Sequence, residues 1–308
     1  MHYVYILLLL FIPAWADMGK IVNLELFDNQ NPAIITDLED EKNHVIVNVS
    51  FAHNEKEEGQ NRINTQQQQH YNAAVKTYRR FDEVVLYLKA FQTVRGVQSD
   101  PTNSSVADIE KSFSSAELGL ATTILDDLDL GISYAYELTD SNITVGTAQL
   151  GLRYVSDFNL AAVAGLRSNK NDFTVKDEQI FYRVGLSRGE TSSVIFDMSL
   201  TYRPQSISEA LDGLLANSQP KTYEGVIQLQ GNEDFLRGGF RFEYQKLFPI
   251  LASELPSYTR KLRYHRGMKV QREENSFSIF YFSYERKEQG FTIDHEFAMG
   301  VSLRGFYD

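Results

Sequence analysis

The sequence predicts an all-β fold, a single antiparallel sheet of about fourteen strands, with about twelve as the next alternative. Three observations predict it. Apolar and polar side chains alternate in one run after another, polar breaks separate these runs, and the connections alternate between short and long. This alternation has the two-residue period of a strand, in which successive side chains point to opposite faces. The sheet therefore has one apolar face and one polar or small face.

The clearest strands lie between Leu128 and Arg203. In the segment 128–139 one parity is apolar throughout, with Leu128, Leu130, Ile132, Tyr134, Tyr136 and Leu138. The intervening positions are polar or small, and the pattern recurs in 147–154, 180–187 and 193–203. Strands of a soluble sandwich alternate as well. Alternation alone therefore leaves open whether the apolar face meets lipid or a second sheet.

The remaining strands follow the same pattern with less regularity. The full set is expected near 21–27, 45–52, 81–93, 114–125, 128–139, 143–155, 158–168, 178–188, 193–203, 222–231, 235–247, 259–272, 276–287 and 291–304. Residues 54–77 are rich in Gln and mostly polar, which predicts a flexible, solvated insert ending in a helical turn. In the loop 205–220, Ser206 and Glu209 have capping-box spacing ahead of apolar residues at helical spacing, which predicts a short helix.

The connections favour a barrel that spans a membrane. Short connections fall at 126–127, 156–157, 189–192, 232–234 and 273–275, and most of those between them are longer, at 95–112, 168–178, 204–221 and 248–258. Short turns at one end and longer loops at the other are the layout of transmembrane barrels. The short connections at 140–142 and 287–290 are exceptions. A tilted strand of about ten residues spans roughly 23 Å, close to the apolar band of such barrels.

The N-terminus reads as an export signal. Residues 1–16 contain an apolar run that ends in Ala14-Trp15-Ala16, which predicts cleavage between Ala16 and Asp17 and a mature domain of residues 17–308. The chain has no cysteine, which excludes a disulfide scaffold and thiolate metal sites. A net charge of −11 argues against nucleic-acid binding. No cluster has metal-ligand spacing, and the sequence predicts no cofactor.

Energetics decides which face would meet lipid. Arg237 and Arg241 oppose Phe240 and Phe242, and an Arg near mid-membrane costs about 2 to 4 kcal/mol. The charged parity is therefore expected to face the lumen, as the pore-lining residues Glu117, Asp129, Glu137, Arg153, Arg167, Arg183, Arg203, Arg237, Arg241, Lys261 and Arg263. Charge inside a pore sets its solute preference. The alternative is a set of internal salt bridges that fill a closed barrel.

A serine motif and two histidines are the candidates for catalysis, and two arginines break the alternation. The motif Gly185-Leu186-Ser187-Arg188-Gly189 matches a nucleophile elbow, but the chain after it returns to a strand and not to the helix that the motif requires. His265, expected in the lumen, is the best candidate base for a barrel enzyme, and His295 is expected at the lipid side or rim. No residue is assigned a catalytic role, which favours a non-enzymatic protein. Arg260 and Arg266 fall on the apolar parity. Either they lie near the rims, where Arg260 could meet lipopolysaccharide phosphates, or this strand faces a partner.

The closing segment adds a resemblance. Residues 291–304 alternate, and the chain ends in Gly305-Phe306-Tyr307-Asp308. This resembles the last strand of bacterial outer-membrane β-barrel proteins, which usually ends in an aromatic residue recognised during assembly. The resemblance implies a Gram-negative outer membrane, with membrane lipid, lipopolysaccharide and the barrel-assembly machinery as partners; no oligomeric state follows from it.

The expected function is a porin-like channel for passive passage of small polar or anionic solutes. One alternative is a lipid-modifying barrel enzyme of the esterase or deacylase type. Another is a non-conducting structural or adhesive barrel. A soluble, exported β-sandwich is the alternative fold.

Overall fold

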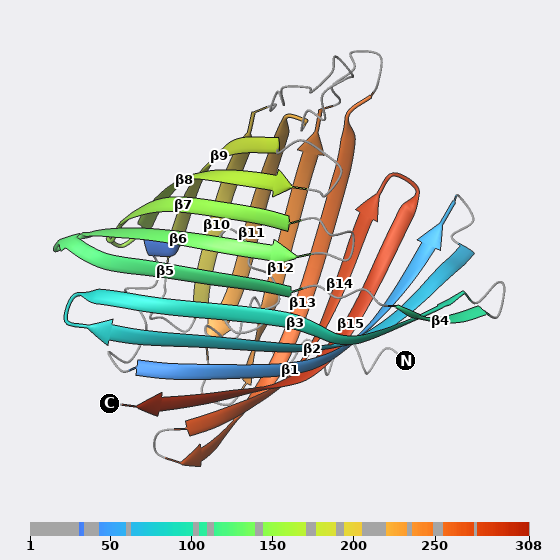
Figure 1. The fold of residues 1–308 in the computed structure, drawn as a ribbon, viewed down its shortest axis with the longest axis horizontal. Helices are drawn as coiled ribbons and strands as arrows, with labels where there is room; N and C mark the ends of the chain where they lie inside the picture. The colour runs from blue at the N-terminus through green and yellow to red at the C-terminus, as the bar shows by residue number, and fades with distance from the viewer. Residues whose placement is uncertain are drawn as a thin grey trace.

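The computed structural model describes residues 31–33, 43–59, 63–100, 105–109, 114–138, 144–170, 177–188, 194–204, 220–232, 236–248, 255–273 and 276–307. The strands are β1 (Asn43–Glu58), β2 (Ile63–Phe81), β3 (Val84–Asp100), β4 (Ser105–Ile109), β5 (Ser114–Leu125), β6 (Leu128–Leu138), β7 (Thr144–Tyr154), β8 (Asn159–Lys170), β9 (Asp177–Arg188), β10 (Val194–Arg203), β11 (Thr222–Asn232), β12 (Leu236–Leu247), β13 (Ser257–Glu273), β14 (Ser276–Gln289) and β15 (Thr292–Tyr307). They form one sheet that curls around a central space (Figure 1).

The sheet is closed by its first and last strands. β1 pairs antiparallel with β15 from Asn43↔Tyr307 to Glu57↔Ile293, and its other edge pairs with β2. Fourteen strands complete the ring, and β4 pairs only with the end of β3. Closure gives each strand of the ring two hydrogen-bonded neighbours, so the ring presents no free sheet edge along its wall. The predicted all-β antiparallel barrel of about fourteen strands is confirmed.

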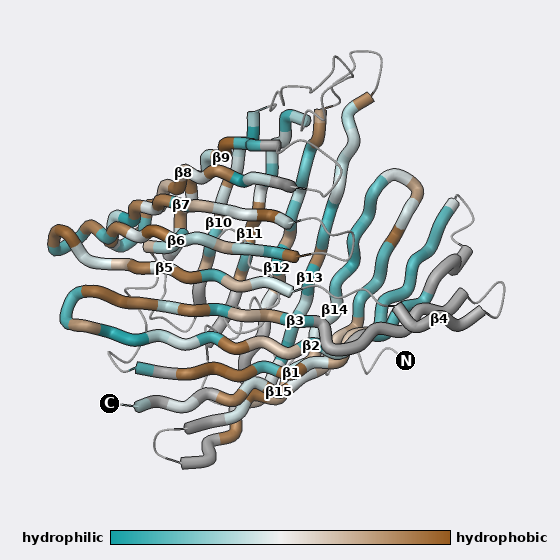
Figure 2. The backbone as a smooth tube through the Cα atoms, viewed as in Figure 1, coloured by the Kyte–Doolittle hydropathy of each residue, from teal (hydrophilic) through white to brown (hydrophobic). Residues whose placement is uncertain are grey.

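Apolar side chains cover most of the outside of the ring, and the inside is lined mainly by polar and small side chains together with some buried apolar ones. In β7, Val145, Thr147 and Gln149 are buried, while Leu150 is 50% exposed and Leu152 is 41% exposed. The alternation recurs in β5 and β6, and Figure 2 shows hydrophobic and hydrophilic residues alternating along these strands. Soluble monomers rarely expose so continuous an apolar surface. The exterior therefore suits hydrocarbon, and the polar interior is the reverse of a soluble protein's core.

The connections follow the predicted two-ended layout. The turns at 82–83, 126–127 and 155–158 lie at one end of the barrel, called here the short-turn end, together with the connections after β9, β11 and β13. The opposite end, called the long-loop end, carries the 204–221 connection and β4. The short connections after β6 and β14 also fall at the long-loop end, as the sequence indicated. Within the described residues, no helix is long and apolar enough to cross a membrane.

The N-terminal part of the barrel differs from the prediction. Residues 54–58 belong to β1 and residues 63–77 to β2, so the expected flexible insert with a helical turn is wrong for these positions. The backbone N–H and C=O groups of this Gln-rich segment are hydrogen-bonded to β1 and β3. The segment therefore forms a strand without needing an apolar face. β2 takes the place in the count that residues 21–27 were expected to fill. Those residues, the signal segment 1–16 and the predicted loop helix at 205–219 lie outside the described residues.

Candidate functional site: the barrel lumen

The lumen is lined by the polar parity of the wall strands. The structure places ten of the predicted lining residues on this inward side: Glu117, Asp129, Glu137, Arg153, Arg167, Arg183, Arg203, Arg241, Lys261 and Arg263. Each stands between outward-facing, mostly apolar neighbours on its own strand. The backbone of Arg237 pairs with Asn232 and Gly267, but its side chain lies outside the described residues. Whether these residues line an open pore remains a prediction.

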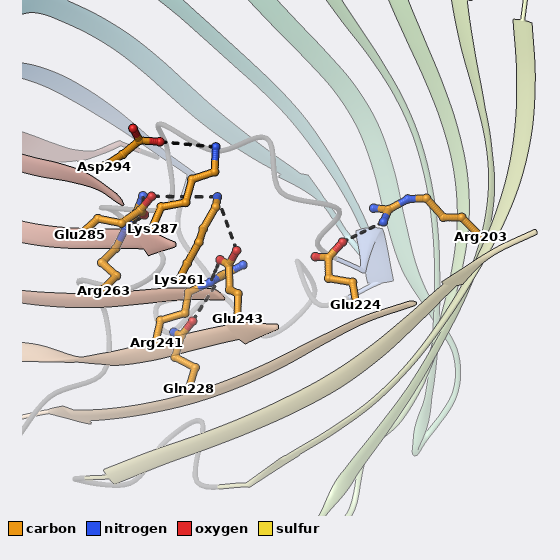
Figure 3. A network of polar contacts seen from close by, with 10 residues as sticks. All are labelled: Arg203, Glu224, Gln228, Arg241, Glu243, Lys261, Arg263, Glu285, Lys287 and Asp294. Carbon is orange, nitrogen blue, oxygen red and sulfur yellow. Dashed lines mark hydrogen bonds and ion pairs between the residues drawn. The ribbon is translucent and has the colours of Figure 1, made fainter. Parts of the chain in front are cut away.

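One chain of ion pairs runs across β12, β13 and β14 (Figure 3). Arg241 Nε donates to Glu243 Oε1 at 2.5 Å, and Lys261 Nζ lies 3.6 Å from Glu243 Oε2 and 4.0 Å from Glu285 Oε1. Arg263 completes the chain with Nη2 at 2.6 Å from Glu285 Oε2. These five residues form the β12–β14 ion-pair chain. Because acid and base alternate along it, each charge is partly compensated by neighbours on the same wall.

Further polar pairs continue around the wall. Arg203 Nη1 lies 2.8 Å from Glu224 Oε2, and Arg183 Nε donates to Thr201 Oγ1 at 2.8 Å. In Figure 3 the Arg203–Glu224 pair lies apart from the β12–β14 ion-pair chain, and both project from the wall into the interior. Basic groups therefore face the lumen from several separate strands.

On β3 and β5 a buried cluster surrounds Glu117. Lys89 Nζ lies 2.9 Å from Glu117 Oε2, and the Tyr87 hydroxyl donates to Glu117 Oε1 at 2.5 Å. The Tyr87 ring lies over Gly119, where an added Cβ would come within 2.1 Å of the ring. The sequence interpretation assigned Glu117 but missed Tyr87 and Lys89. Their signal was the parity of residues 85–91, on which Val85, Tyr87, Lys89 and Phe91 are all buried.

A short N-terminal segment also lies inside the barrel. Asn31, Pro32 and Ala33 are buried against β6 and β7, and the short blue element behind β6 in Figure 1 marks their position. Asn31 Nδ2 donates to the carbonyl of Leu152 at 2.7 Å. Cβ atoms added at the inward positions Gly131 and Gly151 would meet this segment at 2.3 Å and 1.9 Å. The segment therefore occupies part of the lumen cross-section, which the sequence interpretation did not foresee.

The two candidate histidines lie on opposite faces of the barrel wall. His265 faces inward, is 3% exposed and pairs across the sheet with Ser283, yet neither ring nitrogen has a hydrogen-bond partner among the described residues. A serine nucleophile needs a base within hydrogen-bonding reach. His295 lies on the outward side, where its Nδ1 is 2.8 Å from the Tyr284 hydroxyl and its Nε2 is 3.9 Å from Glu57 Oε1.

The serine motif and the two arginines on the apolar parity lie within strands. Ser187 sits in β9, paired with Asn159 and Asp197, so the residues around it form a strand and no nucleophile elbow. Arg260 and Arg266 both follow the outward parity of β13, opposite Tyr244 and Gly238 on β12. No group of three or more potential metal ligands occurs in the part of the chain that the structure describes.

Comparison with known proteins gives a likeness of fold. Neither a scan against protein-family models nor a search of curated proteins gives a match. Among solved structures, CymD, a monoaromatic hydrocarbon channel, superposes with a TM-score of 0.56 at 11% identity over 96% of this chain and 97% of that one. The Pseudomonas putida toluene transporter TodX gives 0.55 at 10% identity, covering 92% and 94% of the two chains.

A Pseudomonas aeruginosa FadL homologue gives a TM-score of 0.53 at 9% identity, covering 96% of this chain and 99% of that one. At such low identity the likeness shows the fold alone. It does not identify a transported solute. The coverage leaves little of either barrel unmatched. This chain therefore has the fold of bacterial outer-membrane β-barrel channels.

Proposed function

We propose that this chain is a passive channel in a Gram-negative outer membrane, with small polar solutes, anions included, as its cargo. The observation that carries the proposal is the contrast between the two faces of one closed sheet. Leu150 and Phe240 lie outside and are 50% and 48% exposed, whereas Gln149 and Arg241 face inward and are buried. A closed ring with this polarity satisfies its backbone internally and encloses a polar path through hydrocarbon.

The chemistry of the wall favours polar cargo. Charged groups at a channel wall exchange hydrogen bonds and ionic contacts with a passing solute and so set its preference. Arg183, Arg203 and Arg263 present guanidinium groups from separate strands, which supports the inclusion of anions. CymD and TodX are described as hydrocarbon channel and toluene transporter. The β12–β14 ion-pair chain makes this wall polar. An apolar solute at such a wall offers the charged groups no hydrogen bonds in place of those they lose.

Assembly is part of the same proposal. β15 ends at Tyr307 and pairs along its length with β1, so insertion requires the last strand to meet the first. We infer that the barrel-assembly machinery inserts the chain and that export precedes insertion. Fractionation of cells that express the full chain should place the heat-modifiable protein in the outer membrane. Recovery in the soluble periplasmic fraction would contradict this location.

Planar-bilayer recording tests the channel. Purified full-length mature protein, shown to be folded by a heat-dependent gel shift, should give discrete conductance steps in KCl. Swelling of protein-loaded liposomes should be faster in small organic anions and sugars than in larger polar solutes. Folded protein that gives neither current nor swelling would overturn the channel and favour a structural barrel. Ester hydrolysis that is lost in His265→Ala would instead favour the enzyme alternative.

A further inference from the structure

A group of lysine and aromatic side chains gathers on the outside of the barrel at its long-loop end. It consists of residues from the adjoining ends of β10, β11, β12 and β13: Tyr202, Lys221, Tyr223, Lys246, Phe248 and Tyr258. This set is called the Lys–aromatic rim cluster. It lies outside the lumen, so the proposed channel function makes no use of it.

Each lysine of the cluster is held over aromatic rings. Lys221 Nζ lies 5.7 Å, 5.1 Å and 5.6 Å from the ring centroids of Tyr202, Tyr223 and Phe248. Lys246 Nζ lies 4.6 Å from the Phe248 ring and 5.4 Å from the Tyr258 ring. Cations at such distances are attracted by the ring faces. The two ammonium groups are therefore positioned, in contrast to freely mobile surface lysines.

The rings themselves form a packed base. Tyr202 and Tyr223 stack with centroids 5.0 Å apart, and Phe248 meets Tyr223 edge-on at 5.8 Å. The amide of Phe248 donates to the carbonyl of Lys221 at 2.9 Å, which fixes the ends of β11 and β12 to each other. The adjacent Tyr223 hydroxyl raises the pKa of Lys221 above its ordinary value. A lysine ammonium is in any case charged at physiological pH.

The cluster stands at the height where a membrane changes from hydrocarbon to headgroups. Along the outward face of β12 the order toward the long-loop end is Phe240, Phe242, Tyr244 and then Lys246. Phe240 and Phe242 are 48% and 42% exposed and belong to the apolar band. Tyrosine belts mark membrane interfaces, and lysine stems extend along them with the charge toward water. In transmembrane barrels the longer loops are extracellular, so this rim faces the outer leaflet.

The cluster itself carries two positive charges. Arg260 lies on the same outward face, opposite Tyr244 on β12 and Glu288 on β14. No carboxylate forms an ion pair with Lys221 or Lys246 within the residues that the structure describes. The opposite rim is different, since its turns carry the exposed acidic residues Asp82, Glu83, Asp126, Asp127 and Asp157. An anionic partner is therefore favoured at the long-loop rim on β10–β13.

We propose that the Lys–aromatic rim cluster binds the phosphorylated headgroup of an outer-leaflet lipid, lipopolysaccharide in a Gram-negative outer membrane. The lysines supply the charge for the phosphates, and the rings fix the lysines at headgroup height. Each cation near an anionic membrane surface contributes about 1 kcal/mol of attraction. The partner is an integral part of the membrane and meets this outward rim directly. The site rests on the outward face meeting lipid and makes no demand on an open lumen.

The test uses folded full-length mature protein in detergent micelles, titrated with bisphosphorylated lipid A and followed by native mass spectrometry. Replacing both cations in Lys221→Ala/Lys246→Ala should weaken binding by about thirtyfold, and each single change by about fivefold. The charge-preserving Lys221→Arg/Lys246→Arg should retain most of the affinity. The matched control is Arg79→Ala, which removes an outward cation 5.0 Å from the Phe81 ring at the opposite rim and should leave affinity unchanged.

Three results would overturn the proposal. One is equal weakening by Arg79→Ala, which would mean that any rim cation serves. Another is equal affinity for dephosphorylated lipid A, which would leave the phosphates without a role. The third is complete displacement of lipid A by an equal concentration of inorganic phosphate, which would make the cluster a simple anion site. If the double variant does not fold, the single variants decide. Bilayer conductance of the same variants should be normal, so failure of the channel and failure of the lipid site remain distinguishable.

Discussion

The side-chain amide of Asn31 donates a 2.7 Å hydrogen bond to the carbonyl of Leu152, 121 residues further along the chain. The side-chain oxygen Oδ1 of Asn31 accepts a 3.0 Å hydrogen bond from the backbone amide of Ala33. A residue that precedes the first barrel strand is thereby attached to the inner wall at β7. Close approach is possible because Gly151 presents no Cβ there. Residues 31–33 are consequently packed against the inner wall of the barrel.

Replacing Gly151 by valine should detach this segment. An added Cβ would lie 1.9 Å from Asn31 Oδ1 and 2.8 Å from Pro32 Cδ, so Gly151→Val requires the segment to move. We expect a larger single-channel conductance in planar bilayers and faster proteolysis before residue 43, with the heat-dependent gel shift preserved. Gly225→Val is the control, because a Cβ there meets nothing within 4 Å. Unchanged conductance in Gly151→Val would show that the segment does not restrict the path.

The buried pair Lys89–Glu117 should contribute strongly to barrel stability. The two side chains are 10% and 5% exposed, and their charged atoms lie 2.9 Å apart. Glu117→Gln leaves the buried Lys89 charge without its counterion, which should cost about 3 kcal/mol in the free energy of unfolding. Urea titration in micelles, followed by far-UV circular dichroism, measures this loss.

The exposed pair Lys56–Glu58 provides the comparison. Its side chains are 37% and 45% exposed, so Glu58→Gln should change the free energy of unfolding by less than about 1 kcal/mol. In Lys89→Met/Glu117→Gln the unpaired charge is absent, and we expect most of the lost stability to return. Equal losses in Glu117→Gln and Glu58→Gln would mean that water reaches the Glu117 cluster freely.

Strand positions in the membrane zone could be predicted because every residue there obeys one constraint. Leu130, Ile132 and Tyr134 must face outward, so the period-two pattern is strict in β6 and its neighbours. The pattern fails where strands continue past the apolar band. In β2 the run Gln66–Gln69 is polar on both faces, and its backbone pairing with β1 and β3 makes it a strand. The Gln-rich composition predicted an insert there, because backbone pairing with a neighbouring strand leaves no pattern in the sequence.

The inward parity of the lumen residues could be predicted, but their partners could not. Arg241 lies directly opposite Arg263. Arg241 is neutralised by Glu243, two residues further along β12, and Arg263 by Glu285, directly across on β14. The pairing across strands depends on the register between them, which alternation leaves undetermined. The docking of Asn31 on β7 has no periodic signal at all. Its one trace is a pair of glycines, Gly131 and Gly151, at inward positions.

Neutralising lumen arginines should shift ion selectivity toward cations. Arg183 donates to the neutral Thr201, and Arg241 lies within the β12–β14 ion-pair chain, so Arg183→Gln/Arg241→Gln removes positive charge from two parts of the wall. We expect the reversal potential across a KCl gradient to move in the cation-selective direction, because wall charge sets the preference of a pore. Arg79→Gln, on the outside, should leave the reversal potential in place. No shift in the double variant would place these residues outside the conducting path.

Arginine placed on the outside of β7 should reveal what touches that face. Leu150 is 50% exposed and lies near the middle of its strand, between Ile132 and Ala164 on the neighbouring strands. In hydrocarbon, Leu150→Arg should cost about 2 to 4 kcal/mol of barrel stability, and Leu138→Arg at the long-loop end of β6 about 0 to 1 kcal/mol. Urea unfolding in phospholipid vesicles measures both. A surface in contact with water predicts instead that both changes lie within about 0.5 kcal/mol of zero. Equal, small effects would therefore remove the lipid-facing exterior, and the membrane channel with it.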